Sequence, residues 1–305
     1  MYNSPLALKK GMLSTFWNML KTTPESFFKD FIYRGSSSSN EEKYWIPQAL
    51  PSFEEWRDLI TYSDFKDSEL TVNNKHYQRG LVIDRDYFAD TRAVLGNQVE
   101  QFMKSLATKY AAFPDALCTL LLAANSAAFD GTAFFATSRP NLDTGSNTIN
   151  NLLGGTLSTA YTTSTFAADF AAAKAAYYAM KDKNDEPFFT APKFVVFVGT
   201  SEEDIAKRVL TTENYIDATT SVQTQNIYIN NAEVRVNYRQ AASDHDWYLI
   251  DLNNPTPPFV IQDRDGLKVD MKDDKFVTGK DVKYLFDFRM GYNFLNPMSI
   301  IKTNN

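Results

Sequence analysis

Residues 92–135 read RAVLGNQVEQFMKSLATKYAAFPDALCTLLLAANSAAFDGTAFF and carry the clearest pattern in the chain. Apolar residues recur there at helical spacing while Glu100 and Lys104 fall on other faces, which predicts a long amphipathic helix. The apolar positions are Val94, Leu95, Val99, Phe102, Met103, Leu106 and Tyr110. Phe113-Pro114-Asp115 ends this helix, because proline suits the first turn of a second helix, which we expect to run to about Ala128.

The residues before this stretch alternate between apolar and polar with a period of two. Leu70-Thr71-Val72 and the run from Tyr77 to Ile83 flank Asn73-Asn74, a dipeptide typical of turns, so we predict a hairpin with its tip there. We expect it to extend across a neighbouring subunit, because an isolated hairpin is marginally stable in water. A short helix is predicted at Phe53–Leu59, with Ser52 as its cap.

Residues 1–43 form a separate N-terminal segment, interrupted by the serine-rich run Gly35–Asn40. The segment is too apolar for a solvated linker and too short for a core of its own, so its side chains require burial against the main body or a neighbouring subunit. We predict that contacts with another subunit provide most of its order. The apolar residues are Phe16, Trp17, Met19, Leu20, Phe27, Phe28, Phe31 and Ile32.

After residue 135 the pattern predicts a loop, then a small α/β lobe, then strands to the end. Residues 130–155 are rich in Gly, Asn, Ser and Thr, with Phe134-Phe135 as their apolar anchor. Helices are predicted at 165–182 and 202–210, and strands at 193–198, 227–229, 233–238 and 247–252. Following the proline cluster Pro255–Pro258, further strands are predicted at 259–262, 267–271 and 282–290.

Composition excludes several classes of protein. The 305 residues exceed the size at which one core usually stops growing, so we expect two lobes. The chain contains no apolar run near 20 residues and no apolar stretch typical of an export signal, so neither a membrane span nor a leader is expected. A net charge of −6 disfavours a protein that grips nucleic acid through its phosphates.

The sequence offers few residues for catalysis. His76 and His245 are the two histidines, and we expect His76 to be solvated in the predicted turn. His245 lies between Asp244 and Asp246, but no further ligands follow at a metal-binding spacing. The single cysteine, Cys118, lies in an apolar run, where a buried and inert thiol is expected.

Known site motifs are absent as well. In the acidic segment from Asp263 to Asp274 the glycine comes at loop position 4 where an EF-hand needs it at 6, and no glutamate closes the loop at 12, so a solvated turn is expected. Gly154-Gly155 lacks the lysine and hydroxyl residue of a phosphate-binding loop. We therefore predict no catalytic, cofactor-binding or metal-binding residue and no cofactor.

The order of these segments, together with short motifs, resembles the Mu-like bacteriophage major head subunit family, whose fold is of the Hong Kong 97 type. The motifs lie between Tyr44 and Phe135 and between Trp247 and Lys302. They are Phe53–Trp56, Asn73–Tyr77, Ile83–Asp86, Phe113–Asp115, Asp130-Gly131, Phe134-Phe135, Trp247–Leu249, Pro258–Gln262, Phe286–Arg289 and Gly291-Tyr292. One position departs from the family pattern, because Ser138-Arg139-Pro140 stands where a His-Pro pair is expected.

The resemblance implies an α+β fold with four parts. They are an N-terminal arm at 1–43, an extended loop at 44–91, a peripheral domain with a spine helix at 92–155 and 256–305, and an axial α/β domain at 156–255. It further implies a structural protein without enzymatic activity, the major capsid protein of a tailed bacteriophage. Its copies would form hexamers and pentamers of an icosahedral shell around double-stranded DNA.

Partners and location follow from the same resemblance. They are other copies of the chain, a scaffold protein, a portal, decoration proteins, and packaged DNA held without sequence specificity, with no membrane involved. The protein would be part of the virion and would assemble in the cytoplasm of the bacterial host. We expect no isopeptide bond between subunits, since Lys66 and Lys75 have no identifiable Asn and Glu partners.

Two other readings remain open from the sequence. The first is a shell of the same fold with another cargo, either a gene-transfer particle or an encapsulin-type compartment. The second is a soluble hydrolase whose carboxylate pair the sequence does not reveal. Electron microscopy separates them, because a shell protein gives closed particles or rings and an enzyme gives small discrete molecules.

Overall fold

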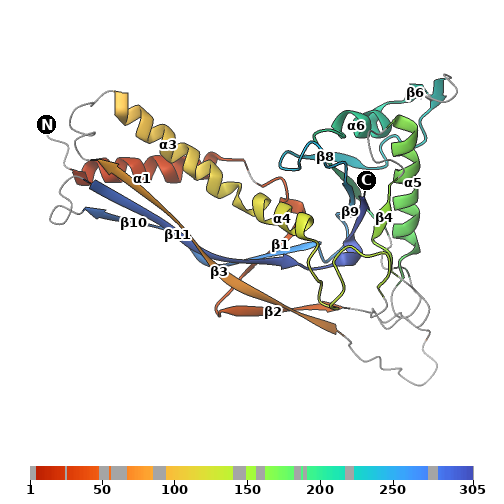
Figure 1. The fold of residues 1–305 in the computed structure, drawn as a ribbon, viewed down its shortest axis with the longest axis horizontal. Helices are drawn as coiled ribbons and strands as arrows, with labels where there is room; N and C mark the ends of the chain where they lie inside the picture. Colours follow the sequence, from red (N-terminus) through yellow and green to blue (C-terminus); the bar gives the residue numbers. More distant parts are fainter. Residues whose placement is uncertain are drawn as a thin grey trace.

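A long, strand-rich arm and a smaller second lobe make up the molecule (Figure 1). The structure is a computed structural model. It describes residues 5–24, 26–47, 55, 67–84, 94–139, 149–155, 162–181, 187, 191–216, 223–273 and 281–304.

The arm is built on a sheet with the strand order β1-β10-β11-β3-β2. Its centre is antiparallel, with β10 and β3 on either side of β11, while β1 adds to β10 in parallel. The strands are β1 (Ile32–Ser36), β2 (Glu41–Pro47), β3 (Asp67–Asp84), β10 (Phe259–Asp273) and β11 (Asp281–Phe294).

Two helices cover one face of this sheet, α1 (Pro5–Thr22) and α3 (Val94–Ala111) (Figure 1). Met103 and Ala107 of α3 are buried with Phe16 of α1 against alternate residues of β11, since a helix and a strand each bury one face. The strand residues in this cluster are Val282, Tyr284 and Phe286. The amphipathic helix predicted at residues 92–112 is confirmed for the part that the structure describes.

The predicted break in the helix is also confirmed. A second helix, α4 (Phe113–Ala124), begins with Pro114 in its first turn, and it ends earlier than expected, at Asn125 in the left-handed conformation with φ of 42°. No single helix in the described part of the chain is long and apolar enough to cross a membrane. The pair Gln101–Ala111 and Phe113–Ala124 meets that criterion only jointly, with a bend of 44°.

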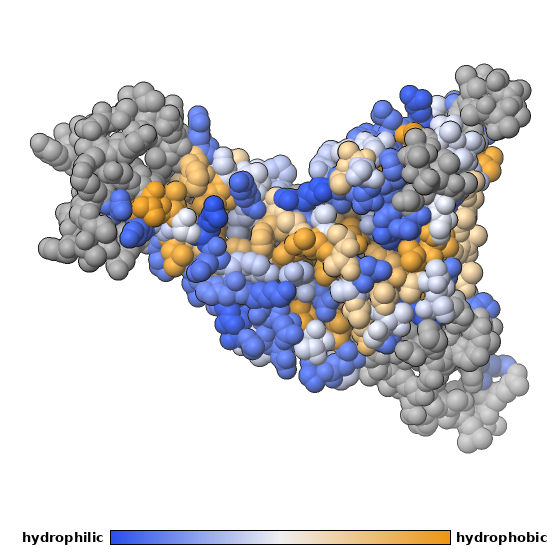
Figure 2. Space-filling view, viewed as in Figure 1, coloured by the Kyte–Doolittle hydropathy of each residue, from blue (hydrophilic) through white to orange (hydrophobic). Residues whose placement is uncertain are grey.

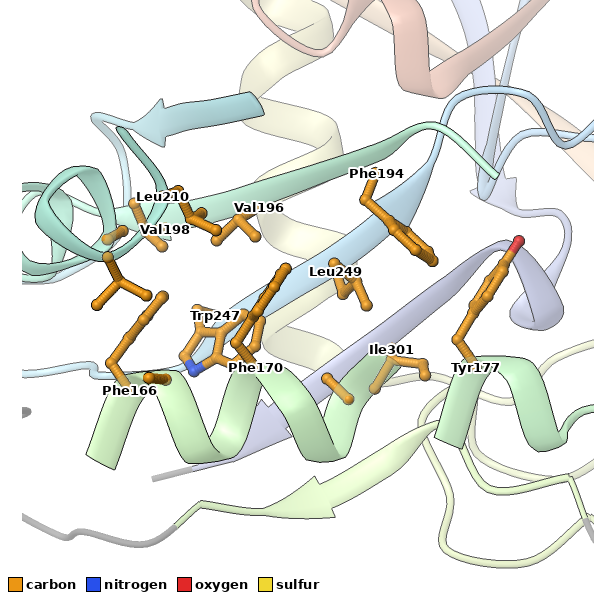
Figure 3. Close-up of a cluster of buried hydrophobic side chains, with 14 of the residues drawn as sticks. Phe166, Phe170, Tyr177, Phe194, Val196, Val198, Leu210, Trp247, Leu249 and Ile301 are labelled. Atoms are coloured by element: carbon orange, nitrogen blue, oxygen red, sulfur yellow. The ribbon is translucent and has the colours of Figure 1, made fainter. Parts of the chain in front are cut away.

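The second lobe has a sheet with the order β4-β12-β9-β5-β8. Its strands are β4 (Leu152–Gly154), β5 (Phe194–Gly199), β8 (Glu233–Asn237), β9 (Trp247–Asp251) and β12 (Ile300–Asn304). Helices α5 (Thr163–Ala179) and α6 (Glu203–Thr211) supply Phe166, Phe170 and Leu210 to a core around Trp247 (Figure 3). The shorter elements are η1 (Lys29–Phe31), β6 (Asn214–Ile216), β7 (Gln223–Gln225) and η2 (Pro297–Ser299).

A central core joins the arm to the lobe. Val196 and Val198 of β5 face the core of the second lobe, while Val195 and Phe197 face this central core. The central core also contains Phe28, Phe31, Leu117, Phe134, Phe135, Tyr248, Phe259, Met290 and Phe294. The expectation that Phe134-Phe135 anchors its loop is confirmed, since both side chains are buried.

The predicted hairpin with its tip at Asn73-Asn74 is wrong. Residues 67–84 form one continuous strand, which pairs with β2 through Asn73 and with β11 from Asn74 onward. Replacing Thr71–Tyr77 by a flexible loop would therefore interrupt the middle of β3, where it pairs with both β2 and β11. The strand that precedes β3 in sequence and pairs with it in antiparallel fashion is β2. The segment between them includes the predicted helix at Phe53–Leu59, and apart from residue 55 it lies outside the described residues.

The prediction that residues 1–43 gain their order mainly from another subunit is wrong in its premise for three of the aromatic side chains, although Trp17 is 39% exposed. Phe16, Phe28 and Phe31 are each 0% exposed within the single chain. The segment alone has no core, but two separate cores of the body bury these side chains: Phe16 packs with α3 and β11, and Phe28 and Phe31 lie in the central core.

Two smaller expectations fail. Residues 227–229 form a turn in which Ile227 is 75% exposed, and Asp263–Gly266 lies inside β10, at a shift in its pairing with β11, rather than in a turn. The predicted division into domains assigns 152–154 and 300–304 to the peripheral part, whereas β4 and β12 complete the second sheet. The division as a whole remains a prediction.

Candidate functional site

The two histidines lie in different parts of the molecule. His76 is in β3 with its side chain 55% exposed, and its Nε2 lies 3.2 Å from Oδ2 of Asp287. It is exposed as predicted, though in a strand and not in a turn. His245 precedes β9, and its Nδ1 lies 2.5 Å from Oε1 of Glu202, whose side chain is 2% exposed.

A carboxylate beside a histidine is a pairing that general bases use, but a general base also needs a cavity that admits a substrate. Neither His245 nor Glu202 is among the described residues that line the principal cavities. The pair links the start of α6 to the turn before β9.

Cys118 is fully buried in the central core, as predicted. Burial raises the pKa of the Cys118 thiol well above its usual range, and the nearby carboxylate of Asp115 raises it further. Because the thiolate is the reactive form, this cysteine is poorly suited to nucleophilic or redox chemistry.

The acidic residues near Asp263 are paired with cations inside the sheet. Asp263 accepts a hydrogen bond of 2.6 Å from Nε of Arg34, and Asp265 lies 3.4 Å from Nζ of Lys268. Among the described residues, no group of three or more His, Cys, Asp or Glu side chains is placed to hold a metal ion. The Arg34–Asp263 pair thus joins β1 to β10, whereas Asp265 and Lys268 both belong to β10.

Two cavities lie beside the helix break. One, of about 530 Å³, lies between the N-terminal segment and the junction of α3 with α4, and its described lining includes Lys29, Arg34 and Tyr110. The other, of about 490 Å³, lies between α4 and β3, with Lys75 at its edge. The described linings contain no carboxylate and no histidine, so these cavities lack the convergent acid and base groups of a hydrolase.

Large apolar side chains are exposed over much of the surface. They are Trp17, Tyr33, Trp45, Val82, Phe102, Leu120, Tyr178, Ile227, Tyr238 and Leu285. On the visible face apolar areas alternate with polar ones, and the outline is hollowed between the helical end of the arm and the second lobe (Figure 2). Leu120 also lines the cavity beside β3. Aromatic and aliphatic residues on several sides suit a protein that contacts neighbours on several sides.

Two buried polar residues have a larger role than the sequence indicated. Arg139 and Gln262 are each 0% exposed and hold segments that are distant in sequence. Gln262 follows the apolar run Phe259–Ile261, and a polar residue after such a run was its only local signal. Nothing in the sequence indicated which groups Arg139 or Gln262 would contact.

The sequence matches the model of the Mu-like prophage major head subunit gpT family over residues 6–165, which is 160 of the 305 residues. No curated protein matches it significantly.

Solved structures with the same fold come from several particles. The procapsid of bacteriophage JBD30 is similar with a TM-score of 0.55 and 17% identity, covering 100% of this chain and 76% of that one. The capsid of cyanophage P-SCSP1u is similar with a TM-score of 0.58 and 13% identity, covering 92% of this chain and 88% of that one. A virus-like particle from Pyrococcus furiosus is similar with a TM-score of 0.52 and 10% identity, covering 97% of this chain and 98% of that one. At such identities the likeness shows the fold.

Proposed function

The chain belongs to the Mu-like prophage major head subunit family, and from this premise we propose that its copies assemble as hexamers and pentamers into an icosahedral shell around double-stranded DNA. The family and the fold are those of structural capsid proteins, which are not enzymes. The observation that carries the proposal is the match of the whole chain to a procapsid subunit, alongside the family match over its first half.

The surface supports assembly from many contacts. Trp45 on β2 is 57% exposed and Leu120 on α4 is 58% exposed, and neither is accounted for by a core of its own chain. Protein interfaces are enriched in such aromatic and apolar residues, and symmetry repeats each contact around a shell. A modest free energy per contact is therefore sufficient for a stable particle.

Partners and location are part of the proposal. A scaffold protein, a portal and decoration proteins are the expected protein partners, with assembly in the cytoplasm of the bacterial host and the mature protein in the virion. The net charge of −6 supports weak, non-specific contact with packaged DNA, since phosphate binding requires a basic face. We also propose that the chain has no catalytic, cofactor-binding or metal-binding residues.

A second candidate is a shell of the same fold with another cargo. The empty particle of a gene-transfer agent is similar to this chain with a TM-score of 0.52 and 10% identity. The archaeal virus-like particle described above has the same degree of likeness. The cargo therefore separates the candidates, and the fold does not.

The test is assembly of the purified full chain, measured by sedimentation and negative-stain microscopy. We expect closed shells or capsomer rings, and nuclease-protected double-stranded DNA in particles from the source organism. Trp45→Ser and Leu120→Ser variants should keep the circular dichroism spectrum of the parent and assemble poorly. Small discrete molecules at every protein and salt concentration, with or without co-produced scaffold, would contradict the proposal. Protected random host fragments would favour a gene-transfer particle.

A further inference from the structure

The long strand β3 changes partner at one point, and there the sheet divides. Residues 67–73 pair with β2 and residues 74–84 pair with β11, so β2 and the first half of β3 form a two-stranded ribbon (Figure 1). The ribbon crosses β10, because Ile46, Leu70 and Val72 pack on Val260. We call the point where the ribbon leaves the sheet the strand crossing.

Gln262 of β10 lies at the strand crossing and is 0% exposed. Its Nε2 donates to the backbone oxygen of Val72 at 2.9 Å and to Oδ1 of Asn74 at 3.0 Å. Its Oε1 accepts a hydrogen bond of 2.9 Å from the hydroxyl of Tyr44. The side-chain amide of Gln262 thus joins β10 to β2 and β3. It accepts one hydrogen bond from β2 and donates two to β3.

The space around this amide is full. A Cβ atom on Gly291 of β11 would lie 2.7 Å from Nε2 of Gln262 and 3.0 Å from the backbone oxygen of Asn73. Glycine is therefore required at this close approach of three strands. The amide of Asn74 also donates to Ser37 Oγ at 2.7 Å and to Ser39 O at 2.9 Å, which ties the turn between β1 and β2 to the same point.

We propose that Gln262 is the positioning residue that sets the direction of the β2–β3 ribbon and hence the way in which this ribbon is presented to a neighbouring copy. The inference rests on the proposed function for its consequence in assembly. A two-stranded ribbon is only marginally stable alone, so its direction depends on what holds its base. Seven residues of strand span roughly 23 Å, so a pivot of about 10° at the base moves the far end by about 4 Å.

The test compares Gln262→Met with a matched control, Asn226→Leu. Asn226 is 3% exposed, lies in the second lobe and also makes three amide hydrogen bonds, to Val209 O and Thr212 O and from the backbone N–H of Tyr228. Both substitutions remove a buried amide and keep a similar volume, so both lower the thermal midpoint. Only Gln262→Met should change the direction of the ribbon.

Direction is measured in the unassembled full chain, as the distance between spin labels on the exposed positions Lys43→Cys and Lys207→Cys, since the buried Cys118 escapes the label. We expect one narrow distance distribution in the parent and in Asn226→Leu, and a shifted or broadened one in Gln262→Met. In assembly, Gln262→Met should give shells of mixed diameter where Asn226→Leu gives uniform ones.

An unchanged distance distribution in Gln262→Met, or an equal broadening in Asn226→Leu, would overturn the proposal. If Gln262→Met does not fold, Tyr44→Phe removes a single hydrogen bond from the strand crossing, and an unchanged distribution there would overturn it as well. The two proposals can also fail separately. If the distance distributions are as expected but the parent protein never forms shells, the role of Gln262 in the subunit is supported and the proposed function is refuted.

Discussion

The buried guanidinium of Arg139 organises the loop that carries Phe134 and Phe135. Its Nη1 lies 2.7 Å from Oδ2 of Asp130, and its Nη2 donates to the backbone oxygens of Ala133 and Phe134 at 2.6 and 2.5 Å. Both charged side chains are almost fully buried, at 0% and 3% exposure. The resemblance led us to expect a His-Pro pair at Ser138–Pro140, and in this chain the ion pair between Arg139 and Asp130 holds the loop at this position.

Removing one partner of the Arg139–Asp130 ion pair should lower the stability of the subunit. Arg139→Met leaves the carboxylate of Asp130 buried without its guanidinium, and we expect a loss of about 3–5 kcal/mol in the free energy of unfolding. Adding Asp130→Asn removes the buried charge and should recover part of that loss. Chemical denaturation of the unassembled subunit measures both values. Equal stability of the single and double variants would show that the buried charge is not the cause.

The N-terminal segment α1–η1–β1 is an integral part of the folded subunit rather than a free arm. The ring of Phe31 lies 5.4 Å from that of Phe197 in β5, and the guanidinium of Arg235 lies 5.4 Å above it. The side chain of Arg235 also bonds Asp30 at 2.6 Å. These contacts connect the segment to the second lobe within one chain.

We therefore expect Phe31→Ala to lower the free energy of unfolding of the unassembled subunit by about 3–5 kcal/mol, because it opens a cavity in the central core. The matched control is Tyr33→Ala, two residues along, where the side chain is 49% exposed and the loss should be about 1 kcal/mol. Thermal and chemical denaturation compare them. Similar small losses for both would mean that the segment is ordered only by neighbouring subunits.

At the level of the entire subunit, the two lobes share the central core and should unfold together. Strand β5 is buried on both faces, with alternate residues in the lobe core and in the central core. Losing either core removes the support of the other, which is the condition for a cooperative transition.

The expected result is that amides of β9 and β11 exchange hydrogen in denaturant with the same free energy of opening. Phe170→Ala, in the lobe core alone, should lower both free energies by a similar amount, about 3–5 kcal/mol. Hydrogen exchange with mass spectrometry resolves the two strands. An effect confined to β9 would show that the lobe unfolds independently.

Local patterns were sufficient for the elements whose own residues specify them. Helical spacing over 94–111 and Pro114 predicted α3, the break and α4, because periodicity and proline act within a few residues. The apolar run of β5 and the helices α5 and α6 were predicted for the same reason. The short motifs that carry the family resemblance also implied a structural protein, and the family match agrees with this.

Long-range contacts decided the rest. Asn73-Asn74 has the composition of a turn, yet the strand continues because β2, β11 and Gln262 satisfy its backbone and side chains from more than 30 residues away. Phe16, Phe28 and Phe31 are buried against residues that are distant from them in sequence, and no local pattern predicts these contacts. A hydrogen bond or a buried contact depends on which groups meet in space, and only the tertiary structure sets that.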